Sequence, residues 1–277
     1  EHLQGLDPNT WQFKAGSYPM LAAFAAEPRS VSLATMYVNF PQGQSRANVN
    51  KNIPLSAGND ISWSLKLNQN FSVTPGMLNI TVPTGMTMAV DTLVASRGDV
   101  KKVFPLKSIP TIFKGEGTAD NPYLIESKED LDKLAEFINI TGFDYDGFNF
   151  RLVNDLDYQG QTWNMICPGV TRFQATFDGN GKTIKGYTYE SESIKAGEGR
   201  YIGPFGTVGG SGIIRNLTMA GTFKALSYVG GIAGDVYGLV ENCTNRSSVT
   251  TKEGGAAGVV ARLMNGGVIR GCTHEGT

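Results

Sequence analysis

The chain has 277 residues, of which 40% are hydrophobic and 18% are charged, and its formal net charge is -1. This composition is typical of a globular protein, and the length leaves room for two domains. A charge so close to zero offers no basic surface to a phosphate backbone, so we expect no nucleic-acid partner. No run of apolar residues is long enough to cross a bilayer, so we also expect no direct membrane insertion of this segment.

Residues 1–27 hold a short aromatic strand around Trp11, a turn at Gly16 and an apolar tail. A segment of this size cannot bury a core of its own. We therefore expect it to pack against the domain that follows.

Residues 28–108 contain short segments in which apolar and polar residues alternate, separated by turns rich in Pro and Gly. The segments are residues 32–40, 61–67, 78–82 and 86–90, with Met86, Met88 and Val90 on the apolar face of the last one. This pattern predicts an antiparallel β-sandwich of about seven strands with an immunoglobulin-like architecture. The Cys-Trp-Cys signature of true immunoglobulin domains is missing from the sequence.

One amphipathic helix is predicted immediately after a turn-rich boundary near residues 106–122. Ser127 and Asp130 have the spacing of a capping box. The apolar face of the helix then consists of Leu131, Leu134, Phe137 and Ile138. We expect this face to cover the first coil of the repeat region that follows, because an open coil would expose its core and its strand edges.

The C-terminal third repeats one motif three times. A Gly-rich turn precedes a second Gly and a short apolar run in residues 203–217, 231–243 and 258–272. The fourth motif positions, 206, 234 and 261, lie 28 and 27 residues apart, which is the period of one solenoid coil. The positions that we expect to shape each coil are Gly203, Gly206, Gly231, Gly234, Gly258, Cys243 and Cys272. We expect the glycines to provide turns with positive φ.

On these motifs, residues 112–277 resemble the GLUG-repeat family of bacterial surface proteins. The match also includes the Gly117–Ile125 entry segment, the predicted helix and the run Phe177–Ile184, whereas Ala261 replaces the last motif glycine in the third unit. The resemblance implies a right-handed parallel β-solenoid, capped by the helix, in a secreted or outer-surface protein of a Gram-negative bacterium. It also implies that residues 1–27 are the closing segment of a preceding repeat region, and that further domains of the same polypeptide lie on either side.

Enzymatic chemistry has little support in the sequence. The only two histidines, His2 and His274, lie at opposite ends, and there is no His-Glu-x-x-His zinc motif. Parallel β-helices also include glycan-cleaving enzymes with paired carboxylates, for which Asp155, Asp157 and Asp178 are the candidates. Because each of these Asp residues also suits a turn, we expect no enzymatic activity and no cofactor.

Two sets of candidate binding residues remain. Asp144, Asp146 and Asn149 supply oxygen atoms at spacings that suit either a calcium loop or a solvated turn. Four tyrosines suit either a sugar-stacking platform or ordinary positions at edges and turns: Tyr158, Tyr187, Tyr189 and Tyr237.

Cys243 and Cys272 occupy equivalent positions of two repeats. Two interpretations are open, namely packing as small buried residues and a disulfide between stacked coils about 4.8 Å apart. For the whole segment we expect an adhesin-like display or binding module with a host glycan or protein as its ligand. The alternatives are a carbohydrate-binding or carbohydrate-cleaving β-helix and a purely structural spacer.

Overall fold

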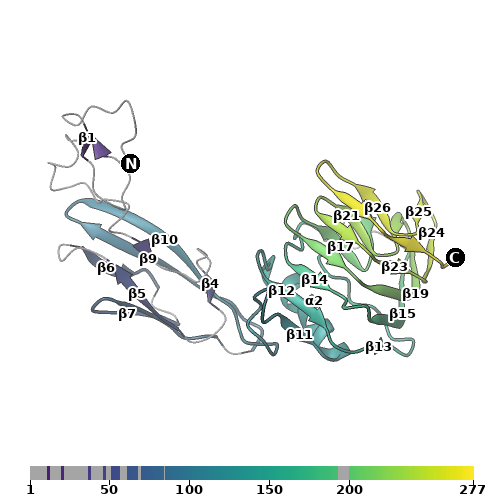
Figure 1. The fold of residues 1–277 in the computed structure, drawn as a ribbon, viewed down its shortest axis with the longest axis horizontal. Coiled ribbons are helices and arrows are strands. Elements are labelled where there is room, and N and C mark those ends of the chain that lie inside the picture. The colour runs from purple at the N-terminus through teal and green to yellow at the C-terminus, as the bar shows by residue number, and fades with distance from the viewer. Residues whose placement is uncertain are drawn as a thin grey trace. The chain divides into compact units, whose positions relative to one another are not determined.

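The chain forms two compact units, Glu1–Thr111 and Ile112–Thr277 (Figure 1). The computed structural model describes residues 11–12, 20–21, 37–38, 46–47, 51–56, 61–67, 70–83, 85–192 and 200–277. Of the predicted segment 1–27, it describes the strands β1 (Trp11–Gln12) and β2 (Met20–Leu21), which pair antiparallel. The other residues of that segment lie outside the described part of the chain.

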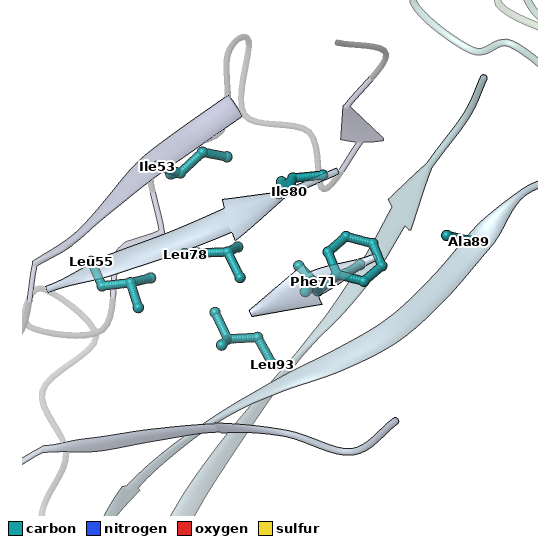
Figure 2. Packing of buried hydrophobic residues seen from close by; sticks show 8 residues of the cluster. Ile53, Leu55, Phe71, Leu78, Ile80, Ala89 and Leu93 are labelled. Carbon is teal, nitrogen blue, oxygen red and sulfur yellow. The ribbon is translucent and has the colours of Figure 1, made fainter. Parts of the chain in front are cut away.

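The first unit contains two four-stranded sheets. One has the order β4 (Arg46–Ala47), β10 (Val100–Ser108), β9 (Ala89–Arg97) and β6 (Ser62–Leu65). The other has the order β3 (Tyr37–Val38), β5 (Lys51–Ser56), β8 (Met77–Ile80) and β7 (Phe71–Thr74). Side chains from both sheets, among them Leu78, Phe71 and Leu93, form one hydrophobic cluster (Figure 2).

The predicted inward face of one strand in this unit is wrong. Ala89, Asp91 and Leu93 of β9 are buried, whereas Val90 is 45% exposed. The Asp91 carboxylate accepts hydrogen bonds from the backbone N–H groups of Lys66 and Leu67 at 3.1 and 2.9 Å. The buried Asp91 therefore holds the residues that follow β6. Because an alternation rule places polar residues on the surface, it assigns Asp91 and the residues that share its face to the wrong side of β9.

The second unit contains the predicted helix, α2 (Lys128–Thr141). The Ser127 hydroxyl accepts a hydrogen bond from the Asp130 N–H, and the Asp130 carboxylate accepts one from the Ser127 N–H, so the capping box is confirmed. Gly142 ends the helix in the left-handed region. The buried helix face includes Phe137, whose ring contacts the rings of Phe143 and Tyr145 beside the first coils.

The remaining strands wind into a parallel β-solenoid of about five turns (Figure 1). The longest sheet has the order β11 (Tyr123–Ile125), β12 (Asn149–Leu152), β14 (Thr176–Asp178), β18 (Ile213–Arg215), β22 (Leu239–Glu241) and β27 (Val268–Arg270). A second sheet contains β13 (Leu156–Asp157), β15 (Thr183–Ser191), β19 (Thr218–Ala225), β23 (Thr244–Asn245) and β28 (Thr273–His274), and β24 (Ser248–Thr251) also pairs with β19.

Two three-stranded parallel sheets complete the coils. One contains β16 (Tyr201–Ile202), β20 (Tyr228–Gly230) and β25 (Ala256–Ala257). The other contains β17 (Phe205–Val208), β21 (Ala233–Val236) and β26 (Val260–Leu263). Equivalent residues of successive coils are paired in every sheet, so the three sequence repeats lie directly above one another.

An unbroken column of inward side chains runs through the longest sheet. Register places Tyr123, Phe150, Phe177, Ile214, Val240 and Ile269 beside one another in that order. The first five are at most 1% exposed, and Ile269 is 39% exposed. The column buries apolar surface continuously, as expected for coils that cannot form a core singly.

The motif glycines serve close packing, which differs from the predicted role in turns. Gly203, Gly206, Gly231, Gly234 and Gly258 are not among the glycines with positive φ. Instead, a Cβ atom at Gly234 would overlap the carbonyl oxygens of Tyr201 and Gly206 in the preceding coil. A side chain would force the coils apart, so glycine is required here by the distance between backbones.

Candidate functional site

Parallel coils in register place equivalent outward side chains side by side, so the candidate site is an outer surface of the stack. One such row consists of Asp178, Arg215, Glu241 and Arg270, which alternate in charge. Arg215 Nη2 lies 3.1 Å from Asp178 Oδ2, and Arg270 Nη2 lies 2.7 Å from Glu241 Oε2. These contacts link neighbouring coils on the outside as the apolar column does on the inside.

Asp178 is the best-buried carboxylate of this row. Burial alone would raise its pKa, but hydrogen bonds from Asn216 Nδ2 and the Asn180 N–H, together with Arg215, outweigh burial and lower the pKa. The charged form of Asp178 is therefore part of the folded structure.

A second surface combines aromatic rings with a charge pair. We define the tyrosine–arginine surface as Tyr201, Tyr228, Asp235, Tyr237 and Arg262, which are all partly exposed. The Tyr201 and Tyr228 rings stack with centroids 4.8 Å apart and an interplanar angle of 19°. The Arg262 guanidinium lies 3.8 Å from the Tyr201 centroid, so aromatic and charged groups form one continuous patch.

Asp235 fixes the position of Arg262 within this surface. The two residues are partners in the register of β21 and β26. Arg262 Nε and Nη2 each donate to an Asp235 carboxylate oxygen at 2.7 Å, which is a bidentate pair. This hydrogen bonding is the main cause that raises the pKa of Arg262, with smaller contributions from Tyr201 and Tyr237. Arg262 therefore remains a cation that is held over the Tyr201 ring.

The tyrosine–arginine surface suits contact with a ligand through ring faces and a fixed guanidinium. At its edge, the Arg172 guanidinium lies 4.3 Å from the centroid of the Tyr237 ring. Ring faces bind the C–H face of a sugar or an apolar side chain, and guanidinium N–H groups donate to hydroxyl or carboxylate oxygens. Such chemistry supports binding without any reacting group.

Three of the four tyrosines predicted for sugar stacking lie inside the coils, which corrects that prediction. Tyr158 is 1% exposed and donates to Asp132 Oδ1 at 3.1 Å, and Tyr187 is 1% exposed with its hydroxyl 2.6 Å from Ser247 Oγ. Tyr189 is 4% exposed and stacks on Phe223. These tyrosines face inward, where their rings pack in the interior and the hydroxyls of Tyr158 and Tyr187 have hydrogen-bond partners.

Tyr237 alone of the predicted four belongs to the outer surface, and Tyr201 and Tyr228 were missed. A signal for the missed pair exists in the sequence, because both precede a hydrophobic residue and a glycine, in Tyr201-Ile202-Gly203 and Tyr228-Val229-Gly230. Because the two tyrosines occupy equivalent positions of successive repeats and point outward, the register of the coils predicts that their rings stack.

Each of the three calcium candidates makes a hydrogen bond to another group of the protein. The Asp144 carboxylate accepts the Asp146 N–H, Asp146 Oδ1 accepts the Ser211 hydroxyl at 2.7 Å, and Asn149 Nδ2 donates to the Gly117 carbonyl. Within the described residues, no three His, Cys, Asp or Glu side chains gather in a way that could hold a metal ion.

The carboxylates considered for glycan cleavage each have a local structural partner. Asp155 Oδ1 accepts the Thr183 N–H at 2.8 Å, and Asp157 Oδ1 accepts the Gln159 N–H at 2.9 Å. Asp178 is held by Arg215, as described above. These contacts tie turns to neighbouring coils.

Comparison with known proteins shows similarity over about half of the chain. No family model and no solved structure matches it. A "Putative Gly-rich membrane protein" of Evansella cellulosilytica is 35% identical in an alignment of 138 residues that covers 46% of this chain and 15% of that protein. Halomucin of Haloquadratum walsbyi is 28% identical in an alignment of 165 residues that covers 55% of this chain and 2% of halomucin.

The chain therefore spans only a small part of the length of these relatives. In the described part of the chain, no helix is both long and apolar enough to cross a membrane. The similarity and the β-solenoid together fit a repeat-containing surface protein.

Proposed function

We propose that this chain is a non-enzymatic segment of a larger bacterial surface protein, in which a solenoid displays an adhesin-like binding surface. The proposal includes a right-handed solenoid of the GLUG type and an immunoglobulin-like sandwich formed by the two sheets of the first unit. It also includes an extracellular or outer-surface location on a Gram-negative bacterium and further domains on both sides. The short share of the relatives' length that the chain spans supports the last point.

The observation that carries the proposal is the pairing of equivalent outward residues in successive coils. Such pairing turns short repeats into rows of side chains over the length of the stack, which suits contact with an extended ligand. The acidic candidates for catalysis are occupied in turns and coil-to-coil contacts, and this supports a role without turnover.

The tyrosine–arginine surface is the proposed contact surface. It offers the stacked rings of Tyr201 and Tyr228 and the fixed guanidinium of Arg262. We assign it a host glycan or protein as ligand, because ring faces and guanidinium groups are frequent in both kinds of interface.

The proposal is tested with the full chain, fluorescently labelled, on arrays of host glycans and of extracellular proteins. We expect binding that is lost in the Tyr201→Ala/Tyr228→Ala double variant and kept in Lys185→Ala, which alters a side chain of the distant β15. Binding that survives the double variant contradicts the assigned surface. An absence of any binding favours a spacer, and release of glycan fragments favours a cleaving enzyme, so both outcomes overturn the proposal.

A further inference from the structure

Two cysteine side chains lie side by side in the last two coils. Cys243 follows β22 and Cys272 follows β27, and the flanking pairs Glu241 with Arg270 and Thr244 with Thr273 are in register. The Thr273 N–H donates to the Cys243 carbonyl at 2.9 Å, so the register continues through the cysteines. Neighbouring parallel strands lie about 4.8 Å apart, within the Cα separation of about 4.4–6.8 Å that a disulfide accepts.

The two thiols make equivalent contacts with backbone carbonyl groups. The Cys243 Sγ lies 3.3 Å from the Glu241 carbonyl oxygen and 3.8 Å from that of Ile214. The Cys272 Sγ repeats both contacts one coil further on, with Arg270 at 3.4 Å and Val240 at 3.6 Å. Equivalent contacts mean that both side chains leave the backbone in the same direction, and each thiol shifts the pKa of the other.

We propose that Cys243 and Cys272 form a disulfide that fastens the last described coil of the solenoid to the coil before it. The pairing is specific, because the equivalent position of the preceding coil is Leu217. The third cysteine, Cys167, is buried in another part of the solenoid. The proposal is independent of the ligand-binding role given above.

The difference in exposure sets the order of the chemical steps. Cys243 is fully buried, whereas Cys272 is partly exposed. The neighbouring Cys243 thiol is the main cause that lowers the pKa of Cys272, which favours the Cys272 thiolate. The oxidant is a low-molecular-weight disulfide such as oxidised glutathione.

The Cys272 thiolate attacks one sulfur of the external disulfide, breaks its S–S bond and releases one thiolate. A mixed disulfide on Cys272 remains. Cys243 then gives up its proton and attacks the Cys272 sulfur, which forms the protein disulfide and expels the second thiolate. Two protein thiols are oxidised, one external disulfide is reduced to two thiols, and the protons released by the protein thiols are taken up by the two departing thiolates.

The test exposes the folded full chain to oxidised glutathione, blocks remaining thiols with an alkylating agent and maps peptides by mass spectrometry. We expect one cross-linked peptide pair, Cys243 with Cys272, whose mass is lower by two hydrogen atoms, and Cys167 as a thiol. The Cys167→Ala variant should form the same cross-link. Alkylation of both Cys243 and Cys272 after oxidation, or glutathione held on Cys272 without closure, would overturn the proposal.

A second measurement examines the consequence for the fold. Oxidation should raise the melting midpoint of the second unit by several degrees and slow hydrogen exchange in β27 and β28. Cys272→Ser, which changes the more exposed partner and preserves the buried Cys243, should abolish both effects. Unchanged melting and exchange on oxidation, or the same gain in Cys272→Ser, would contradict a disulfide between these coils.

Discussion

The early and late coils of the solenoid solve the same packing problem with different interiors. Near α2 the coils bury large rings. The Tyr145 ring, for example, contacts the rings of Phe143, Phe148 and Phe150. Beyond Phe223 the buried side chains are smaller or polar, including Val240 and Asn245 at 0% exposed. The early coils are irregular in sequence, whereas the late coils repeat with a nearly constant period.

The difference shows what a regular repeat requires. At Gly234 a side chain would overlap backbone atoms of the preceding coil, and the interior beside it is lined by small residues such as Ala233 and Val236. A polar residue fits such an interior when each group has a partner. The Asn245 amide donates to the Gly258 carbonyl at 2.8 Å and accepts the Ser247 N–H at 2.9 Å.

The largest expected effect tests the aromatic interior. Phe177→Ala removes a ring that is 0% exposed and that packs 5.3 Å from Phe205, centroid to centroid. We expect the free energy of unfolding of the second unit to fall by about 3–5 kcal/mol in chemical denaturation. Ile269→Ala, in the same column but 39% exposed, should cost about 1 kcal/mol. Equal losses at the two positions would contradict the column as described.

The second prediction concerns close approach between the late coils. Gly234→Ala introduces a Cβ that overlaps backbone atoms of the preceding coil, so we expect a loss of about 1–3 kcal/mol. The natural Ala261 occupies the equivalent position one coil further on. Ala261→Gly should change stability by no more than about 1 kcal/mol, through backbone entropy alone. A neutral Gly234→Ala would show that the coils are less tightly spaced.

The third prediction uses pH to test the outer row. Asp178→Asn should cost about 1–2 kcal/mol at neutral pH, because it removes the charge that Arg215 pairs with. The folded pKa of Asp178 lies below its ordinary value, so its contribution is complete above about pH 4 and is lost as the pH falls through the folded pKa. The difference in melting midpoint between the two proteins should therefore shrink as the pH falls below about 4. A difference in stability that grows as the pH falls would contradict a lowered pKa of Asp178 in the folded protein.

The fourth prediction addresses the corners of the late coils. Asn242 has a φ of 52°, and Gly271 takes the equivalent place in the next coil with a φ of 60°. Asn242→Ala should lose about 1 kcal/mol, because alanine tolerates the left-handed region poorly, whereas Asn242→Gly should stay within about 0.5 kcal/mol of the wild type. Similar losses of stability in both variants would mean that the side chain of Asn242, and not its backbone conformation, stabilises the corner.

The smallest effect belongs to an exposed pair. Lys224 Nζ lies 2.6 Å from Glu190 Oε1, and both side chains are at least half exposed. Lys224→Ala should change stability by no more than about 0.5 kcal/mol, and added salt should remove the change. A larger loss would mean that this exposed pair contributes more than an ordinary surface ion pair does.

Sequence reasoning found the elements whose signals are local. The capping box of Ser127 and Asp130 marks the helix start, and the spaced glycines mark the coils, because both features depend on short distances along the chain. The direction in which each tyrosine ring points could not be predicted from such local signals. Whether a ring such as Tyr187 turns inward depends on space and on a partner 60 residues away, Ser247, and neither is encoded nearby. Asp91 inverted a strand face for a similar reason.

The central claim is that the second unit is a stack of coils in register. Spin labels carried by non-canonical amino acids at Arg151 and Arg270, with the three native cysteines intact, test it most directly. Four successive pairings connect these positions, through Asp178, Arg215 and Glu241. Electron-spin distance measurements should give one narrow distribution consistent with backbones about 19 Å apart, which is four strand spacings. A broad distribution, or a mean that corresponds to backbones much farther apart, would contradict the stack.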